Sequence, residues 1–182
     1  MSPGGRILLV LDLDETLVYA TERPLARPPD FTAGPYAVYR RPHLGEFVRG
    51  CSERFDLAFW SSSSEAYVAT VVPAILPAGV EAAFAWSRGR CVRRFDPETR
   101  GDYFVKDLRK VRRRGFDLSR VLVVDDTPRK AERNYGNAVY VRPWLGETDD
   151  NELELLGRYL ASLHAVPDLR TLEKRGWRQP LT

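Results

Sequence analysis

Residues 7 to 16 read Ile-Leu-Leu-Val-Leu-Asp-Leu-Asp-Glu-Thr, an apolar run that ends abruptly in the carboxylates of Asp12 and Asp14, with Thr16 behind them. Such a run is typical of a parallel strand buried on both faces, and ligands of open α/β sheets bind at the carboxyl ends of these strands. Two acids placed there can hold a divalent cation and attack an electrophile. We therefore expect an active site at this point; the alternative is a polar turn that only caps a helix.

The composition is that of an ordinary folded domain. The chain has 182 residues, of which 43% are hydrophobic and 29% charged, so a single domain over residues 1–182 is expected. No apolar stretch reaches the length of a membrane span, and the first residues, Met-Ser-Pro-Gly-Gly-Arg, lack the pattern of an export signal. We expect a cytoplasmic protein with no membrane partner, while the sequence sets no oligomeric state.

Cysteine and charge usage give weaker signals. Cys51 and Cys91 are too few for a disulfide framework, and we expect both to be reduced. The net charge is only +3, but residues 88–120 hold twelve basic side chains against five acidic ones. This asymmetry can attract phosphate-rich partners. A solvated helix face over residues 109–114 is favoured over a nucleic-acid patch, because no aromatic residues are interleaved.

Apolar runs alternate with amphipathic stretches, which predicts an α/β fold. The runs cover residues 7–11, 55–60, 120–124 and 138–141. Helices are expected with a buried face of Leu44, Phe47, Val48 and Cys51, from Ser63 or Ser64 to about Leu76, over 151–164, and as a short segment over 168–175. Residues 24–40 are predicted to be a loop with one short strand, and residues 82–105 an inserted β-hairpin.

Further polar residues follow the later strands or lie between them. Ser61 and Ser62 follow the second apolar run, Asp125 and Asp126 end the third, and Lys106 lies between the two. Transfer of a phosphoryl group needs a nucleophile, positive charge and donors for the phosphoryl oxygens, and an acid for the leaving group. The sequence offers a candidate for each role.

The ordered set Asp12-Leu-Asp-Glu-Thr16, Ser61, Lys106 and Asp125-Asp126 resembles the four motifs of the haloacid-dehalogenase superfamily of phosphatases. Asp-Leu-Asp-Glu-Thr-Leu-Val at 12–18, Arg-Pro-His at 41–43, Val-Lys-Asp-Leu at 105–108 and Asn-Ala-Val at 137–139 resemble its FCP/SCP branch, which dephosphorylates serine in the tail of RNA polymerase II and in other proteins. The resemblance spans roughly residues 6–175. It implies a three-layer, Rossmann-like fold with a mainly parallel sheet and no large cap domain.

The resemblance also implies roles for the motif residues. Asp12 would be the nucleophile and form an aspartyl-phosphate, and Asp14 would be the acid and base. Mg²⁺ would lie on the Asp12 carboxylate, the backbone carbonyl of Asp14 and the Asp125 side chain. Lys106 would neutralise charge on the phosphate and the nucleophile. Thr16 would support Asp14 through a local hydrogen bond.

Other assignments leave alternatives open. Asp126 is either a metal-shell residue or a loop cap. The run of four serines leaves the register open, so Ser61 and Ser62 are both candidates to bind the phosphate, with Ser63 or Ser64 better suited to capping a helix. Arg88 could contact the phosphate, or it could be an inert surface arginine.

The spacing of the motifs bears on the substrate. The segment between Thr16 and Arg41 is shorter than in the polymerase-tail phosphatases, and residues 91–106 are expanded. No interval is long enough for a large cap, which predicts an open cleft. Such a cleft admits a phosphate on a protein or a nucleic-acid chain and small phosphoesters alike; it is the resemblance to the FCP/SCP branch that implies a phosphorylated protein or peptide as substrate.

Two other functions compete with this reading. One is a phosphatase of nucleic-acid ends or small phosphoesters, and the other is a catalytically silent binding module. The second arises because residues 143–147, Pro-Trp-Leu-Gly-Glu, resemble a segment of a related mitochondrial import subunit. A cysteine phosphatase is excluded, because neither cysteine is followed six residues later by arginine.

Overall fold

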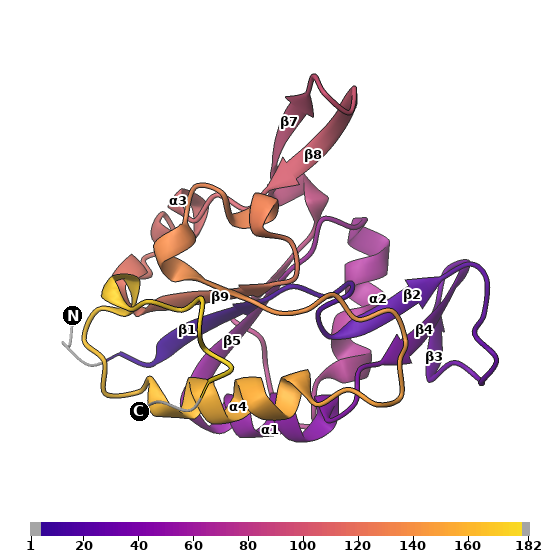
Figure 1. The fold of residues 1–182 in the computed structure, drawn as a ribbon, viewed down its shortest axis with the longest axis horizontal. Coiled ribbons are helices and arrows are strands. Elements are labelled where there is room, and N and C mark those ends of the chain that lie inside the picture. The colour runs from indigo at the N-terminus through magenta and orange to yellow at the C-terminus, as the bar shows by residue number, and fades with distance from the viewer. Residues whose placement is uncertain (1–4, 180–182) are drawn as a thin grey trace.

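The apolar run that opens the chain forms the central strand of a five-stranded parallel sheet (Figure 1). The computed structural model describes residues 5–179. The strand order is β10-β9-β1-β5-β6, and every neighbouring pair is parallel. The bounds are β1 Ile7–Leu11, β5 Phe55–Trp60, β6 Phe84–Trp86, β9 Val121–Asp125 and β10 Ala138–Tyr140. The four apolar runs are thus confirmed as strands of one sheet.

Helices cover both faces of this sheet, which confirms the predicted three-layer α/β fold. Helices α1 (Leu44–Arg54), α2 (Glu65–Ile75) and α4 (Glu152–Ser162) pack against one face, and the short α3 (Arg109–Arg112) packs against the other. Figure 1 shows α1 and α4 below the sheet and α3 above it. Short 3-10 turns complete the layers, at Arg88–Arg90, Leu118–Arg120, Pro128–Ala131, Tyr135–Asn137 and Leu169–Thr171.

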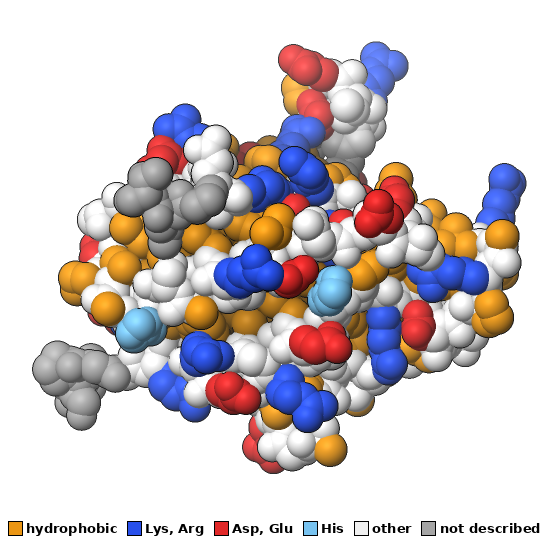
Figure 2. Space-filling model, turned by 60° about the horizontal axis from the view of Figure 1, so that its bottom comes forward, with side chains coloured by type: hydrophobic (Ala, Val, Ile, Leu, Met, Phe, Trp, Pro, Cys, Tyr) orange, Lys and Arg blue, Asp and Glu red, His pale blue; other side chains and the backbone are white. Residues whose placement is uncertain are grey.

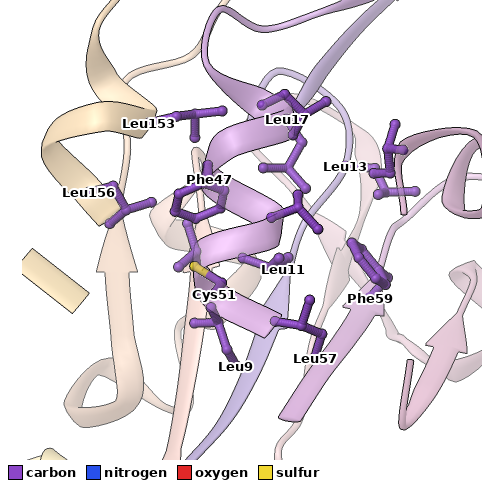
Figure 3. Close-up of a cluster of buried hydrophobic side chains, with 14 of the residues drawn as sticks. Leu9, Leu11, Leu13, Leu17, Phe47, Cys51, Leu57, Phe59, Leu153 and Leu156 are labelled. Atoms are coloured by element: carbon purple, nitrogen blue, oxygen red, sulfur yellow. The ribbon is translucent and has the colours of Figure 1, made fainter. Parts of the chain in front are cut away.

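Alternate side chains of β1 enter two separate cores because successive residues of a strand point to opposite faces. Leu9 and Leu11 pack with α1, α2 and α4, whereas Leu8 and Val10 face α3. Figure 3 shows the first core, in which Phe47 of α1 lies among leucines of the sheet and of α4. Burial on both faces explains why the strand reads as an unbroken apolar run.

The helix signals in the sequence were accurate. All four positions predicted for the buried face of α1 are buried: Leu44, Phe47, Val48 and Cys51. Helix α2 begins after Ser64, whose hydroxyl accepts a hydrogen bond from the Tyr67 amide at 3.3 Å. The segment expected over 168–175 is helical only as a 3-10 turn at Leu169–Thr171.

Two antiparallel sheets lie beside the main sheet and correct two predictions. Strands β2 (Val18–Thr21), β4 (Tyr36–Arg40) and β3 (Phe31–Ala33) form the first, so residues 24–40 hold two strands, not one. The second is a hairpin of β7 (Val92–Asp96) and β8 (Gly101–Val105) that projects from the molecule in Figure 1.

The predicted hairpin over 82–105 is therefore wrong at its beginning. Phe84–Trp86 is β6, the edge strand of the main sheet, and pairs in parallel with β5. The reason is packing: Trp86 lies edge-on against Trp60 of β5, with ring centroids 4.9 Å apart, and both rings are buried.

The face formed by α1 and α4 carries basic, acidic and hydrophobic side chains interspersed (Figure 2). Among residues 5–179, none of the helices combines the length and the apolar content that a membrane span needs.

Candidate active site

The topology brings three of the predicted motifs to one edge of the main sheet. Asp12 and Ser61 directly follow β1 and β5, and Asp125 is the last residue of β9. Strand β1 lies between β5 and β9, so the carboxyl ends of these strands are neighbours. Lys106 directly follows β8, and its backbone amide donates to the carbonyl of Lys130 at 2.7 Å.

Two lysines and two aspartates form the centre of the site. Lys106 Nζ lies 2.7 Å from Asp12 Oδ1 and 2.6 Å from Asp125 Oδ2. Lys130 Nζ lies 2.9 Å from Asp12 Oδ2 and 3.6 Å from Asp125 Oδ1. Asp12, Asp125 and Lys106 are fully buried, whereas the Lys130 side chain is 19% exposed. Each carboxylate therefore presents one oxygen to each ammonium group.

The surroundings shift the pKa values of these groups, downward for Asp12 and upward for Asp125 and Lys106. Burial by itself raises the pKa of Asp12, but Lys106 and Lys130 outweigh burial and hold this pKa below its ordinary value. Burial, and then the charge on Asp12, raise the pKa of Asp125. Burial lowers the pKa of Lys106, but Asp12 and Asp125 more than compensate, so the net shift is upward. Asp12 is thus held as the ionised carboxylate that a nucleophile requires.

Asp14 faces a different set of partners, all of them hydroxyl groups. Its Oδ2 accepts hydrogen bonds from Ser61 at 3.1 Å and Ser63 at 2.9 Å, and its Oδ1 accepts one from Tyr67 at 2.5 Å. Burial and the neighbouring Asp14 raise the pKa of Tyr67, so this phenol stays protonated and donates. The carboxylate is thereby fixed in one orientation beside the predicted phosphate-binding serine.

The loop that follows β1 is held by a tight turn and by a buried arginine. Glu15 has a φ of 60°, which is unusual for a residue other than glycine, and the Leu17 amide donates to the Leu13 carbonyl at 2.8 Å. Arg41 donates to the backbone carbonyl of Thr16 at 3.0 Å. This arrangement fixes the backbone on which both Asp12 and Asp14 lie.

The remaining candidates are Thr16, Ser62 and Arg88, and not all of them make the contacts that were predicted. Thr16 does not face Asp14 as expected; its hydroxyl makes a long hydrogen bond of 3.5 Å to Asp126 Oδ1, because the turn directs it toward the end of β9. The Ser62 carbonyl accepts from Arg88 Nε at 2.7 Å. Arg88 therefore lies at the serine loop, in the 3-10 turn between β6 and β7, and not on the hairpin.

Three carboxylates form a group that fits a divalent cation. Asp12, Asp125 and Asp126 each offer one oxygen, and these oxygens lie within 4.8 Å of one another. Asp12 Oδ1 is buried without a well-directed hydrogen bond, although Lys106 Nζ is close to it. Carboxylate oxygens are the ligands that a hard cation such as Mg²⁺ prefers. The Asp14 side chain points to its hydroxyl partners, so any part it takes here is through its backbone.

Sequence reasoning missed three residues of this site, among them Ser63, which was expected only as a possible helix cap but donates to Asp14. Lys130 contacts Asp12, Asp125 and, at 3.3 Å, Asp126. A lysine four residues after a carboxylate pair at a strand end was the available signal for it. Tyr67 was predicted only as a helix residue, and its position in the first turn of α2 brings its hydroxyl to Asp14.

Comparisons with known proteins identify a family and a fold for this chain. The family model described as NLI interacting factor-like phosphatase matches residues 7–170. The chain is 33% identical over 173 residues to the human carboxy-terminal domain RNA polymerase II polypeptide A small phosphatase 1, covering 91% of this chain and 62% of that protein. It is 30% identical over 198 residues to CTD nuclear envelope phosphatase 1 of Xenopus tropicalis, covering 98% and 76%.

The relatives differ in how much of their length is matched. A CTD small phosphatase-like protein 2 of Dictyostelium discoideum is 31% identical over 172 residues, yet the chain covers only 29% of it. Fission yeast RNA polymerase II CTD phosphatase Fcp1, solved bound to beryllium fluoride, shares the fold with a TM-score of 0.68 at 20% identity, over 88% of this chain and 63% of that one. The chain thus has a fold of the haloacid-dehalogenase type, and it belongs to the NLI interacting factor-like phosphatase family.

Proposed function

We propose that this protein is a Mg²⁺-dependent phosphomonoesterase that works through an aspartyl-phosphate on Asp12. The observation that carries the proposal is the buried contact of Lys106 with both Asp12 and Asp125 at the carboxyl edge of the sheet. Burying charges is costly, so an arrangement of this kind is a functional-site candidate in its own right. The chain's membership of a phosphatase family indicates which reaction this site would catalyse.

The side chains divide the reaction into two steps. In the first, an Asp12 carboxylate oxygen attacks phosphorus, the bond from phosphorus to the substrate oxygen breaks, and Asp14 gives that oxygen its proton. In the second, Asp14 takes a proton from water, the water oxygen attacks phosphorus, and the carboxylate of Asp12 leaves with inorganic phosphate as the product. Lys106 and Ser61 donate to the phosphoryl oxygens and offset their charge.

The carboxylates of Asp12, Asp125 and Asp126, together with the backbone carbonyl of Asp14, would hold Mg²⁺. When bound there, the ion would neutralise charge on the phosphoryl oxygens. Asp126 supports this role through its place in the group of three carboxylates.

We infer that the substrate is phosphoserine or phosphothreonine of a protein in the cytoplasm. One of the relatives is named as a small phosphatase of the carboxy-terminal domain of RNA polymerase II, and another as a CTD small phosphatase-like protein. The insertions between the motif strands are two small antiparallel sheets, and the serine loop stays exposed at Ser64 and partly exposed at Ser62 and Ser63. An uncovered site admits a phosphate that is carried on a polypeptide. Free thiols at Cys51 and Cys91 are compatible with a reducing compartment.

The deciding experiment compares wild type with Asp12→Asn and Asp14→Asn on phosphopeptides and on p-nitrophenyl phosphate with Mg²⁺. We expect Asp12→Asn to abolish turnover while its thermal unfolding remains cooperative. Asp14→Asn should leave a phosphoenzyme that forms from the activated ester but hydrolyses slowly. Near wild-type turnover in Asp12→Asn would refute covalent catalysis at this residue.

A second candidate is a phosphatase of nucleic-acid ends, favoured by exposed arginines over residues 88–114 such as Arg93, Arg100 and Arg112. Strong, salt-sensitive turnover of phosphorylated oligonucleotides without turnover of phosphopeptides would select it. The binding-module reading has lost one of its supports, because Trp144 is buried and its indole donates to the Glu147 carbonyl at 2.8 Å. That segment is explained by packing.

A further inference from the structure

Lys130 lies on the carboxylate oxygens that a metal would need. Lys106 takes Asp12 Oδ1 and Asp125 Oδ2, which leaves Asp12 Oδ2 and Asp125 Oδ1 directed at Lys130. Lys130 Nζ also lies 3.3 Å from Asp126 Oδ1. Its ammonium group therefore contacts the same three carboxylates that form the candidate metal group.

Lys106 and Lys130 differ in how readily their side chains can move away from the carboxylates. The Lys106 side chain is 1% exposed, so it is confined between its two carboxylate partners. The Lys130 side chain is 19% exposed and reaches the site from the rim, on the 3-10 turn Pro128–Ala131. Its backbone is fixed, because its carbonyl accepts from the Lys106 amide at 2.7 Å. The side chain can therefore move into solvent while the turn stays in place.

We propose that Lys130 is a built-in competitor for the metal site, whose ammonium group holds the three carboxylates in the metal-free protein and is displaced when Mg²⁺ binds. This inference rests on the metal site of the proposed function. The physical basis is that Lys106 supplies one positive charge for three closely spaced carboxylates, so repulsion between them remains unless a second cation lies on their other oxygens. A monovalent ammonium meets that need until a divalent ion replaces it.

Competition of this kind has two linked consequences. Removing the ammonium group destabilises the metal-free protein, because the carboxylates lose a counter-ion. It also strengthens metal binding, because the ion no longer has to displace a bound cation. A lysine that instead helped to position the carboxylates for the metal would weaken metal binding when removed. The sign of the change in affinity therefore separates the two roles.

The test is calorimetric titration with MgCl₂ of wild type, Lys130→Met and Lys130→Gln. We expect the dissociation constant for Mg²⁺ to fall at least about tenfold in Lys130→Met, as for the loss of one competing charge-assisted hydrogen bond. Metal-free Lys130→Met should melt at a lower temperature than metal-free wild type. Saturating Mg²⁺ should raise the melting temperature of the variant by more than it raises that of wild type. Lys130→Gln, which keeps a hydrogen-bonding group at the site, serves if the methionine variant does not fold without metal.

Arg129→Met is the matched control, since it removes the same charge one residue away. Arg129 pairs with Asp96 of the hairpin at 2.7 Å, so its loss should change the Mg²⁺ affinity by less than about twofold. Unchanged or weaker Mg²⁺ binding in both Lys130 variants, with wild type binding the ion, overturns the competition but not the metal site. If neither wild type nor the variants bind Mg²⁺, the metal site and this inference fail together.

A structure of wild type with Mg²⁺ gives a readout that needs no variant. Lys130 Nζ should then lie more than about 4 Å, the limit of an ion pair, from Asp12 Oδ2. An ammonium group that keeps its contact beside the bound ion would refute displacement.

Discussion

The hydroxyl of Tyr67 donates to Asp14 Oδ1 at 2.5 Å, the shortest of the three hydrogen bonds that this carboxylate accepts from hydroxyl groups. The proposed acid and base is thus oriented by a residue on the first turn of α2. Tyr67 is also packed from the other side, edge-on against Tyr36 with ring centroids 6.0 Å apart. The fold can therefore retain the ring when the hydroxyl is removed.

Tyr67→Phe should lower kcat by about tenfold with little change in KM, as expected for the loss of one hydrogen bond to a charged group. The loss should be larger for alkyl phosphates than for p-nitrophenyl phosphate, because only a poor leaving group needs full proton transfer from Asp14. Steady-state kinetics on both substrates measure this. An equal loss on both would show that Tyr67 does not act through the acid.

The ion pair of Arg41 and Asp150 should make an acid-sensitive contribution to the free energy of unfolding. The Arg41 side chain is fully buried and bonds to both oxygens of Asp150, at 2.8 and 2.9 Å. Asp150→Ala should reduce the free energy of unfolding by about 3 kcal/mol, because it leaves a buried guanidinium without its carboxylate. Denaturant unfolding measures the loss. Asp149→Ala, at the exposed neighbouring position, should have an effect within about 0.5 kcal/mol.

The pH dependence of this pair follows from its pKa. Burial raises the pKa of Asp150, but the hydrogen bonds and charge of Arg41 outweigh it, so the folded pKa lies below the ordinary value. A carboxyl group of this kind stabilises the fold above its unfolded pKa of about 4, and the contribution is lost as the pH falls through the folded pKa. Wild type should therefore lose more stability than Asp150→Ala between about pH 6 and pH 3. Parallel curves would contradict this.

Site residues that follow a strand could be predicted from the sequence, whereas residues placed by tertiary structure could not. Asp12, Ser61 and Asp125 could be placed together because each follows an apolar run, and the carboxyl ends of neighbouring parallel strands must meet. Lys130 was missed because its place after the carboxylate pair does not show where its side chain points, and its contact with Asp12 depends on the direction of a 3-10 turn. Phe84–Trp86 was assigned to a hairpin because three residues are too short to show whether they join the main sheet.

The two thiols should be unreactive at neutral pH, which also tests the exclusion of a cysteine nucleophile. Burial raises the pKa of the Cys51 thiol to about 12, and burial also raises that of Cys91. Since the thiolate is the reactive form, iodoacetamide at about pH 8 should modify neither thiol quickly. Cys91, which is less buried, should react before Cys51. Mass spectrometry of native and unfolded protein follows this.

We expect Arg88 to contribute to phosphate binding from its place beside the serine loop. Its Nε donates to the Ser62 carbonyl at 2.7 Å, and its guanidinium lies over the Phe104 ring at 5.1 Å from the centroid. These contacts hold an exposed cation beside the serine loop, where it can meet a phosphoryl oxygen. Arg88→Gln should raise the inhibition constant of inorganic phosphate by about threefold to tenfold, the range for a partly exposed charged contact.

The matched control for Arg88 is Arg112→Gln, an exposed arginine of α3, which changes the net charge equally. Phe104→Ala should reproduce part of the Arg88 effect, because it removes the ring on which the guanidinium lies. If Arg112→Gln weakens phosphate binding as much as Arg88→Gln does, the effect belongs to the overall charge and Arg88 has no particular role. A selective effect at Arg88, together with an intermediate one at Phe104, assigns the contact to the turn between β6 and the hairpin.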